Sequence, residues 1–272
     1  MKLRRISAVL LCSAACLASA AQRELAVCSD PSNLPFSNER QEGFENRIAR
    51  LIADDLNATL RYTWNMQRRS FLRRTLMSGD CDVVMGVPLG LERVAATQPY
   101  YTSTYVFVTL RSRRLDLHSF DDARLKDLKI GLQALGAEGA NTPPAAALAR
   151  RGITQHIVGY PMWGDEDEEN PQARIIEAVA HGDIDTAIVW GPFAGYFAKQ
   201  FGNRLKLAPV DADPQQPGLA FAYPMALGVR KADVELRATL QGVLERRHTD
   251  IEKILNDYGV PVVAPATRSG GE

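Results

Sequence analysis

The chain has 272 residues, of which 46% are apolar and 24% charged, a composition typical of globular proteins rather than of disordered or fibrous ones. Its 32 Lys and Arg residues balance 32 Asp and Glu residues, so bulk charge gives no basis for binding nucleic acid. No stretch reaches the roughly 18 apolar residues that a membrane-spanning helix requires, and the length favours one large domain or two medium ones.

The first twenty residues are typical of an export signal. Three basic residues precede an apolar run over 6–18, and small residues at 18–20 match the needs of signal peptidase. A buried N-terminal helix is disfavoured because all the charges lie at one end. A lipid anchor on Cys16 is disfavoured because no aliphatic residue lies three positions before it. We therefore expect residues 1–20 to be removed and the mature protein to be periplasmic.

Removal of that segment leaves two cysteines, Cys28 and Cys81, each within or beside an apolar run that favours a strand. An oxidising compartment favours a disulfide between them. However, Cys28 lies late in its predicted strand whereas Cys81 begins another. That offset can carry the Cα atoms beyond the roughly 7 Å that a disulfide spans. The sequence leaves both the bridged and the free form open.

Strand-forming runs alternate with helical patterns along the rest of the chain. Strands are predicted at 24–29, 59–64, 82–87, 105–110, 129–133, 156–160, 185–190, 205–210 and 225–230. Helices are predicted at 44–56, 141–151, 172–181 and 191–201, followed by two helices or one bent helix over 233–258. This alternation predicts an α/β fold of parallel sheets with helices on their faces.

Two connecting segments divide the predicted elements. Residues 111–128 are highly charged, and 211–218 are interrupted by Pro and Gly. We expect one lobe formed by 22–110 plus 223–272 and a second lobe formed by 111–222. Two chain crossings between α/β lobes make a hinge, and the crevice beside it is the natural binding site.

Motifs of common enzymes are missing from the sequence. It has no G-x-S-x-G, H-E-x-x-H, Walker A or G-x-G-x-x-G pattern, and its four histidines lie far apart. A catalytic triad assembled in space stays open, but no serine lies in a nucleophile-like turn. The sequence therefore predicts a protein that is not an enzyme and has no metal or cofactor.

Two clusters of charge have more than one interpretation. The acidic run Asp165–Glu169 resembles the start of a calcium loop but lacks its glycine and closing glutamate, which favours a solvated loop. Arg68, Arg69, Arg73 and Arg74 form a basic stripe on a predicted helix. A solvated face and an acidic partner explain that stripe equally well.

Five residues are candidates for ligand binding. Arg93 follows a buried strand and a Pro-Leu-Gly turn, where a guanidinium can bind a carboxylate, although a surface arginine fits equally well. Trp190 and Gly191 end one strand and open a helix, so the indole lines the crevice or packs under the sheet. Phe36 follows the first strand, and two interpretations fit it equally well: its ring covers a ligand, or it packs inside its own loop. Trp64 ends the second predicted strand.

At these residues the sequence resembles the periplasmic solute-binding proteins of ABC importers. The resemblance spans 24–260 and rests on phrases such as DPSNLPFSN, EGFENRIARLIADDL, GDCDVVMGVPLGLERVAATQPYY and GDIDTAIVWGP. It implies the amino-acid-type fold, type II, with two Rossmann-like lobes and a double-crossover hinge. WNMQRRSFLRRTL, PYYTSTYVFV and WGPFAGYFA further resemble a branch associated with quinoprotein dehydrogenases. That branch includes the J proteins encoded with methanol dehydrogenases that use pyrroloquinoline quinone.

The resemblance also implies roles for individual residues. By analogy with amino-acid binders, Arg93 would hold the α-carboxylate of a ligand and Phe36 would cover it. The acid that binds the α-amino group in those proteins is replaced here by Trp190. An indole leaves a buried ammonium unpaired, at a cost of several kcal/mol. We therefore expect free α-amino acids to be poor ligands.

The resemblance implies two alternative functions. In the first, the protein is an accessory factor of a quinoprotein alcohol or methanol dehydrogenase, and its cleft holds a small ligand or a partner segment. In the second, it delivers a small carboxylate-bearing solute to an ABC permease. The branch phrases and the missing acid favour the first. Neither function involves nucleic acid.

Overall fold

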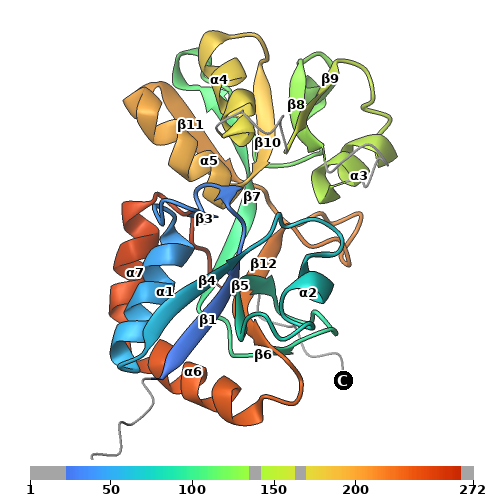
Figure 1. Cartoon of the computed structure of the whole chain (residues 1–272). Helices are drawn as coiled ribbons and strands as arrows, with labels where there is room; N and C mark the ends of the chain where they lie inside the picture. The colour runs from blue at the N-terminus through green and yellow to red at the C-terminus, as the bar shows by residue number, and fades with distance from the viewer. Residues whose placement is uncertain (1–22, 135–141, 163–169, 265–272) are drawn as a thin grey trace, which may run out of the picture.

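The computed structural model describes residues 23–134, 142–162 and 170–264 as a mixed α/β fold (Figure 1). The strands are β1 (Glu24–Ser29), β2 (Ser32–Asn33), β3 (Ser37–Asn38), β4 (Thr59–Trp64), β5 (Val83–Pro88), β6 (Ala95–Ala96), β7 (Tyr101–Leu110), β8 (Ile130–Ala134), β9 (Ile157–Pro161), β10 (Thr186–Trp190), β11 (Leu205–Pro209) and β12 (Ala222–Val229). The α-helices are α1 (Phe44–Asp55), α2 (Phe71–Arg74), α3 (Pro143–Arg150), α4 (Arg174–His181), α5 (Gly191–Ala198), α6 (Val234–Arg246) and α7 (His248–Asp257).

Figure 1 shows these elements in two groups connected by β7. We call β1–β6, β12, α1, α2, α6 and α7 the lower half, and β8–β11 with α3–α5 the upper half. A single path of paired strands runs through both halves, in the order β4-β1-β5-β12-β7-β10-β8-β9. β6 pairs with β12, and β11 pairs with β7. The two halves therefore share backbone hydrogen bonds through one long strand.

Alternating side chains of β1 explain why helices cover both of its faces. Leu25 and Val27 belong to the apolar cluster that contains Phe44 of α1. Ala26 and Cys28 belong to a second cluster, on the α2 side of the sheet. Because successive residues of a strand point to opposite faces, a strand buried on both sides must be apolar at every position. This accounts for the continuous run in the sequence.

β7 is paired differently along its length. Residues 101–104 pair with β12, whereas 105–109 pair with β10 and 106–110 with β11. The change of partner falls between Thr104 and Tyr105, inside the strand. The predicted lobe boundaries, 110/111 and 222/223, remain a prediction.

The sequence predicts parallel sheets, whereas the observed sheet is mixed. β1, β4 and β5 are parallel, as are β8, β9 and β10, but β7, β11 and β12 run antiparallel to their neighbours. The chain passes between the halves in extended strands, without a crossover helix to reverse its direction. Each predicted strand is nevertheless present, and 233–258 forms two helices. Thr142 caps α3 by accepting a hydrogen bond from the amide of Ala145.

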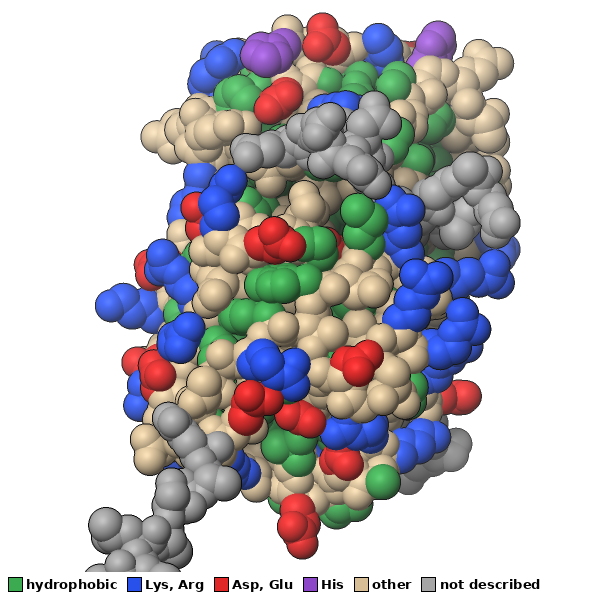
Figure 2. Space-filling model, in the orientation of Figure 1, with side chains coloured by type: hydrophobic (Ala, Val, Ile, Leu, Met, Phe, Trp, Pro, Cys, Tyr) green, Lys and Arg blue, Asp and Glu red, His purple; other side chains and the backbone are tan. Residues whose placement is uncertain are grey.

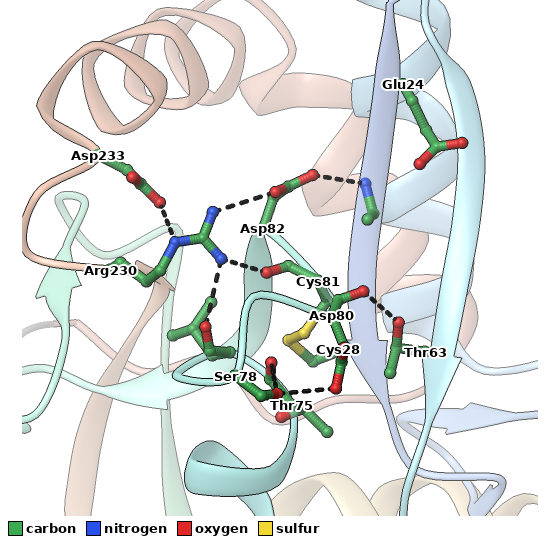
Figure 3. Close-up of polar contacts among 12 residues, drawn as sticks. Glu24, Cys28, Thr63, Thr75, Ser78, Asp80, Cys81, Asp82, Arg230 and Asp233 are labelled. Carbon is green, nitrogen blue, oxygen red and sulfur yellow. Dashed lines mark hydrogen bonds and ion pairs between the residues drawn. A yellow bond between two sulfur atoms is a disulfide. The ribbon is translucent and has the colours of Figure 1, made fainter.

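The cysteines form a disulfide, with their Cα atoms 5.5 Å apart. Cys81 precedes β5, and the turn that carries it lies against β1, so the offset between the strands is taken up by the turn (Figure 3). Arg230 holds this turn by donating to the carbonyl oxygen of Cys81 and by pairing with Asp82 at 3.1 Å and Asp233 at 2.7 Å. The lower half is thus cross-linked both covalently and by charge.

Some sequence predictions fall on residues that the structure does not describe. The export signal at 1–20 and the acidic run at 165–169 are both outside the described ranges. Within those ranges, no helix has the length and apolar character needed to cross a membrane.

Candidate functional site

A cavity of about 210 Å³ lies where the two halves meet. The lower half contributes six lining residues, Asn33, Phe36, Glu45, Gln67, Gly86 and Met225. The upper half contributes Met162, Trp190 and Phe193. Three aromatic rings and two methionines dominate this described lining, and its one ionisable side chain is Glu45.

Phe36 connects the two halves at the edge of the cavity. Its ring contacts Phe44 of the lower half and Phe193 of the upper half, with both pairs of ring centroids 5.1 Å apart. The carbonyl oxygen of Phe36 accepts a hydrogen bond from the amide of Glu45 at 2.9 Å. A Cβ atom at Gly43 would lie 1.9 Å from the same oxygen, so glycine is required there. The start of α1 and the loop of Phe36 are therefore held as one unit.

Trp190 forms the upper wall and is fixed by its neighbours. Its amide donates to the side-chain oxygen of Gln133 at 2.9 Å, and the amide nitrogen of that side chain lies 2.9 Å from the sulfur of Met162. The indole packs edge-on against Tyr105 and Tyr223, at 5.4 Å and 5.8 Å between ring centroids. Aromatic contacts of this kind stabilise a ring in one orientation. The wall is consequently preformed rather than loose.

Glu45 lies in the first turn of α1 and is only 7% exposed. No hydrogen bond or ion pair joins its carboxyl group to a residue that the structure describes. Gly86 makes room for that group, because a Cβ at this position would lie 2.1 Å from the Oε1 atom of Glu45. Gly86 also has a φ of +58°, which favours glycine. It is part of a bulge in which β5 gains one residue relative to β12.

The surroundings of Glu45 disfavour a negative charge. Burial raises the pKa of its carboxyl group to about 8, and the nearby charge of Asp30 adds to the effect. The amino end of α1 acts in the opposite direction but does not replace a cation. The hydroxyl group of Tyr101, which is also buried, has no hydrogen-bond partner among the described residues. The neutral form of Glu45 is therefore favoured by its surroundings, and in that form the carboxyl group can donate or accept a hydrogen bond.

The structure brings together two of the five predicted ligand-binding residues, Phe36 and Trp190, in the cavity lining. Arg93 is exposed in the turn between β5 and β6 and is not part of that lining. Trp64 is half-buried at the end of β4, where its ring stacks on Tyr62 at 4.6 Å. The binding roles of these four residues remain predictions.

Gly191, the fifth predicted residue, begins α5 and lies against β7. A Cβ at this position would come within 2.5 Å of the carbonyl oxygen of Thr104. Glycine here permits close packing of helix and strand. A direct contact of Gly191 with a ligand remains a prediction.

Glu45 is not among the residues predicted to bind a ligand, although the sequence carries a signal for it. Glu45, Ile48, Ala49 and Ile52 have the spacing of one helix face, and the other three are buried apolar residues. An acid on an apolar face is a buried acid, and a buried acid requires either a partner or a raised pKa. Gly86, within an otherwise apolar strand, was a second signal.

The basic stripe is located outside the cavity. Arg68 and Arg69 precede α2, whereas Arg73 and Arg74 lie within it, and all four are exposed. Figure 2 shows Lys and Arg side chains gathered beside α2 on that face of the molecule. In the described part of the chain, no group of three His, Cys, Asp or Glu side chains is placed to hold a metal ion.

Comparisons with known proteins relate this geometry to a family. The model of the bacterial extracellular solute-binding proteins, family 3, matches residues 25–261. A protein named MoxJ from Methylorubrum extorquens is 30% identical over 240 residues, which are 84% of this chain and 78% of that protein.

Two crystal structures extend the similarity. The periplasmic binding protein XoxJ from Methylobacterium extorquens AM1 is 36% identical, with a TM-score of 0.72 over 88% of this chain and 99% of that one. MxaJ from Methlophaga aminisulfidivorans MPT is 26% identical, with a TM-score of 0.76 over 88% of this chain and all of that one. These matches confirm the predicted periplasmic-binding-protein fold and the predicted resemblance to J proteins.

Proposed function

We propose that this chain, which belongs to the bacterial extracellular solute-binding proteins of family 3, is a non-enzymatic accessory factor of a quinoprotein alcohol or methanol dehydrogenase. Its cleft would hold a small ligand or a segment of its partner. The observation that carries the proposal is the similarity to MoxJ, XoxJ and MxaJ over most of the chain. The sequence phrases that resemble the branch associated with such dehydrogenases agree with it.

The chemistry of the cavity supports binding rather than catalysis. Its described lining has no Ser, Cys, His or Lys, and its one ionisable side chain, Glu45, has no nucleophilic side chain beside it in that lining. Aromatic and methionine side chains provide apolar contact, and methionine adapts to different shapes. Such a lining is suited to holding an occupant without transforming it.

Localisation to the periplasm is part of the same proposal. The family is extracellular, and residues 1–20 have the pattern of an export signal. The disulfide between Cys28 and Cys81 is of the kind that persists in an oxidising compartment. Both features support export of the mature chain.

Co-purification provides the direct test. The full-length chain with a C-terminal affinity tag would be isolated from the periplasm of its native host grown on an alcohol. We expect a quinoprotein dehydrogenase in the eluate, identified by mass spectrometry and by bound pyrroloquinoline quinone. A tagged amino-acid-binding protein from the same periplasm is the control. Recovery of no dehydrogenase above this control would contradict the proposal.

A second function is delivery of a small carboxylate-bearing solute to an ABC permease, which the family itself favours. Opposing it, the described lining of the cavity contains no Lys, Arg or His to pair with a carboxylate. A thermal-shift series with free amino acids and simple carboxylates distinguishes the two functions. A true ligand at a hundredfold excess over its Kd stabilises the folded protein by about 2.7 kcal/mol. Under our proposal none of these solutes does so.

A further inference from the structure

We propose that Glu45 and the aromatic wall of the cavity form a subsite for a protonated alkylamine, either a free amine or a lysine side chain of a partner segment. The inference rests on the proposed function only in that the cleft has an occupant. It adds the chemical class of that occupant.

The carboxyl group of Glu45 is placed where a ligand can reach it. Glu45 is more than nine-tenths buried, lines the cavity and has no protein partner among the described residues. Gly86 leaves space for its Oε1 atom, since any larger residue would displace it. A buried carboxyl group without a partner costs stability. Its retention at the wall of a cavity indicates that the partner is a ligand.

The titratable groups around that carboxyl group supply no positive charge. The titratable neighbours of Glu45 are Asp30 from the loop after β1, Tyr62 from β4, and Tyr100 and Tyr101 from the start of β7. None of them is a cation, and the described upper wall contributes no titratable side chain. An ammonium group in the cavity would supply the missing positive charge and stabilise the carboxylate form.

The aromatic wall of the cavity suits the rest of the occupant. Phe36, Trp190 and Phe193 line the cavity, and the faces of aromatic rings attract cations. Methionine side chains from both halves complete the apolar lining. A zwitterionic amino acid fits less well than a simple amine, because its carboxylate would find no described cation. An anion is disfavoured for the same reason.

The size of the cavity agrees with a small occupant. Its volume of about 210 Å³ is below the roughly 300–1,000 Å³ of sites that enclose drug-sized ligands. A short aliphatic amine or the end of one lysine side chain is the appropriate scale. A larger solute would require the two halves to separate.

Calorimetry with matched probes tests the subsite. The purified full-length chain would be titrated at pH 8.5 with n-butylamine, n-butanol and butyrate, which differ in charge but little in size. We expect n-butylamine to bind at least tenfold more tightly than either of the others. Comparable binding of n-butanol, or no binding of n-butylamine, would overturn the inference.

Variants identify the residue that is responsible. Glu45→Gln keeps the shape of the side chain but cannot become negative, and we expect it to weaken n-butylamine binding at least tenfold. Glu39→Gln removes an exposed carboxylate from the same half and should leave binding unchanged. Equal affinity of wild type and Glu45→Gln for n-butylamine would assign the site elsewhere.

The wild type alone offers a readout that does not depend on a variant folding. Because Glu45 must lose its proton to pair with an ammonium group, affinity should fall about tenfold for each pH unit below pH 8. Calorimetry between pH 6 and pH 7, in buffers with different protonation enthalpies, should detect about one proton released per amine bound. Affinity that does not change between pH 6 and pH 8.5 would refute the proposal.

A further arm distinguishes the source of the amine. Nα-acetyl-lysine amide mimics a lysine within a peptide, and its norleucine analogue lacks the charge. Tighter binding of the lysine compound than of n-butylamine indicates a partner segment, and the reverse indicates a free amine. Amine binding without dehydrogenase capture contradicts only the proposed partner. Dehydrogenase capture without amine binding contradicts only the subsite.

Discussion

Two buried carboxyl groups, Asp213 in the upper half and Glu45 in the lower half, have opposite surroundings. In the upper half, Asp213 accepts hydrogen bonds from both terminal nitrogens of Arg151, at 2.8 Å and 2.9 Å. This pairing holds the pKa of Asp213 below its usual range. In the lower half, Glu45 has no such cation, and burial raises its pKa.

The difference separates a structural acid from one that is available to a ligand. Arg151 lies at the end of α3 and also pairs with Asp121 at 2.8 Å, so three distant segments are tied together through one guanidinium. The carboxylate of Asp213 is therefore fully paired within the protein. Glu45 is satisfied only by losing its charge or by binding a cation. Perturbed acids in cavities are accordingly good candidates for functional groups.

The largest expected effect is on the pH dependence of stability, and it follows from replacing Glu45. Burial raises its pKa from an ordinary 4.5 to about 8, so its contribution to stability is complete below pH 4.5 and is lost as the pH rises through 8. Glu45→Gln removes this dependence. We expect the free energy of unfolding of the variant, relative to wild type, to increase by about 3 kcal/mol between pH 5 and pH 8. Urea unfolding at both pH values measures this, and a constant difference would contradict it.

A smaller loss of stability is expected when Asp213 loses its partner Arg151. Arg151→Met leaves an enclosed carboxylate unpaired, and we expect a loss of about 2–3 kcal/mol at pH 7. Arg61→Met, which removes an exposed ion pair with Glu24, is the matched control and should cost less than about 1 kcal/mol. Because the pKa of Asp213 is lowered in the folded protein, the wild-type pair contributes at neutral pH and is lost in acid. Equal losses in the two variants would show that Asp213 is not held as described.

The smallest effect on stability is expected from removing the hydroxyl group of Tyr101, close to Glu45. The hydroxyl group of Tyr101 is buried without a described partner, so Tyr101→Phe should change stability by less than about 1 kcal/mol and in the stabilising direction. Tyr258→Phe removes a hydrogen bond to the carbonyl oxygen of Glu42 and should cost about 1 kcal/mol. Thermal unfolding of both variants tests the difference in sign. A destabilised Tyr101→Phe would reveal a partner for that hydroxyl group.

Local features of the sequence could be predicted well. The apolar run of β1 and the 3–4 spacing of α1 determine those elements without distant information. Phe36, in the loop after β1, and Trp190, at the end of β10, both line the cavity, in line with their predicted positions after strands of the two lobes. These inferences depend only on nearby residues.

Features that depend on distant partners could not be predicted. Whether Glu45 or Asp213 is paired depends on residues far away in the chain, and Arg151 is 62 positions from Asp213. The disulfide depends on the path of the turn before β5, which strand offsets alone do not specify. The exposure of Arg93 follows from the same kind of loop geometry.

The position of β12 also has a consequence for biosynthesis. This strand lies between β5 and β7 in the sheet, yet residues 89–221 are made after β5 and before it. A growing chain therefore leaves one edge of β5 without its neighbour until translation is nearly complete, and open strand edges invite aggregation. Transport of an unfolded chain before it closes the sheet would avoid this exposure. A product truncated before residue 222 would leave the edges of β5 and β7 that normally face β12 open permanently.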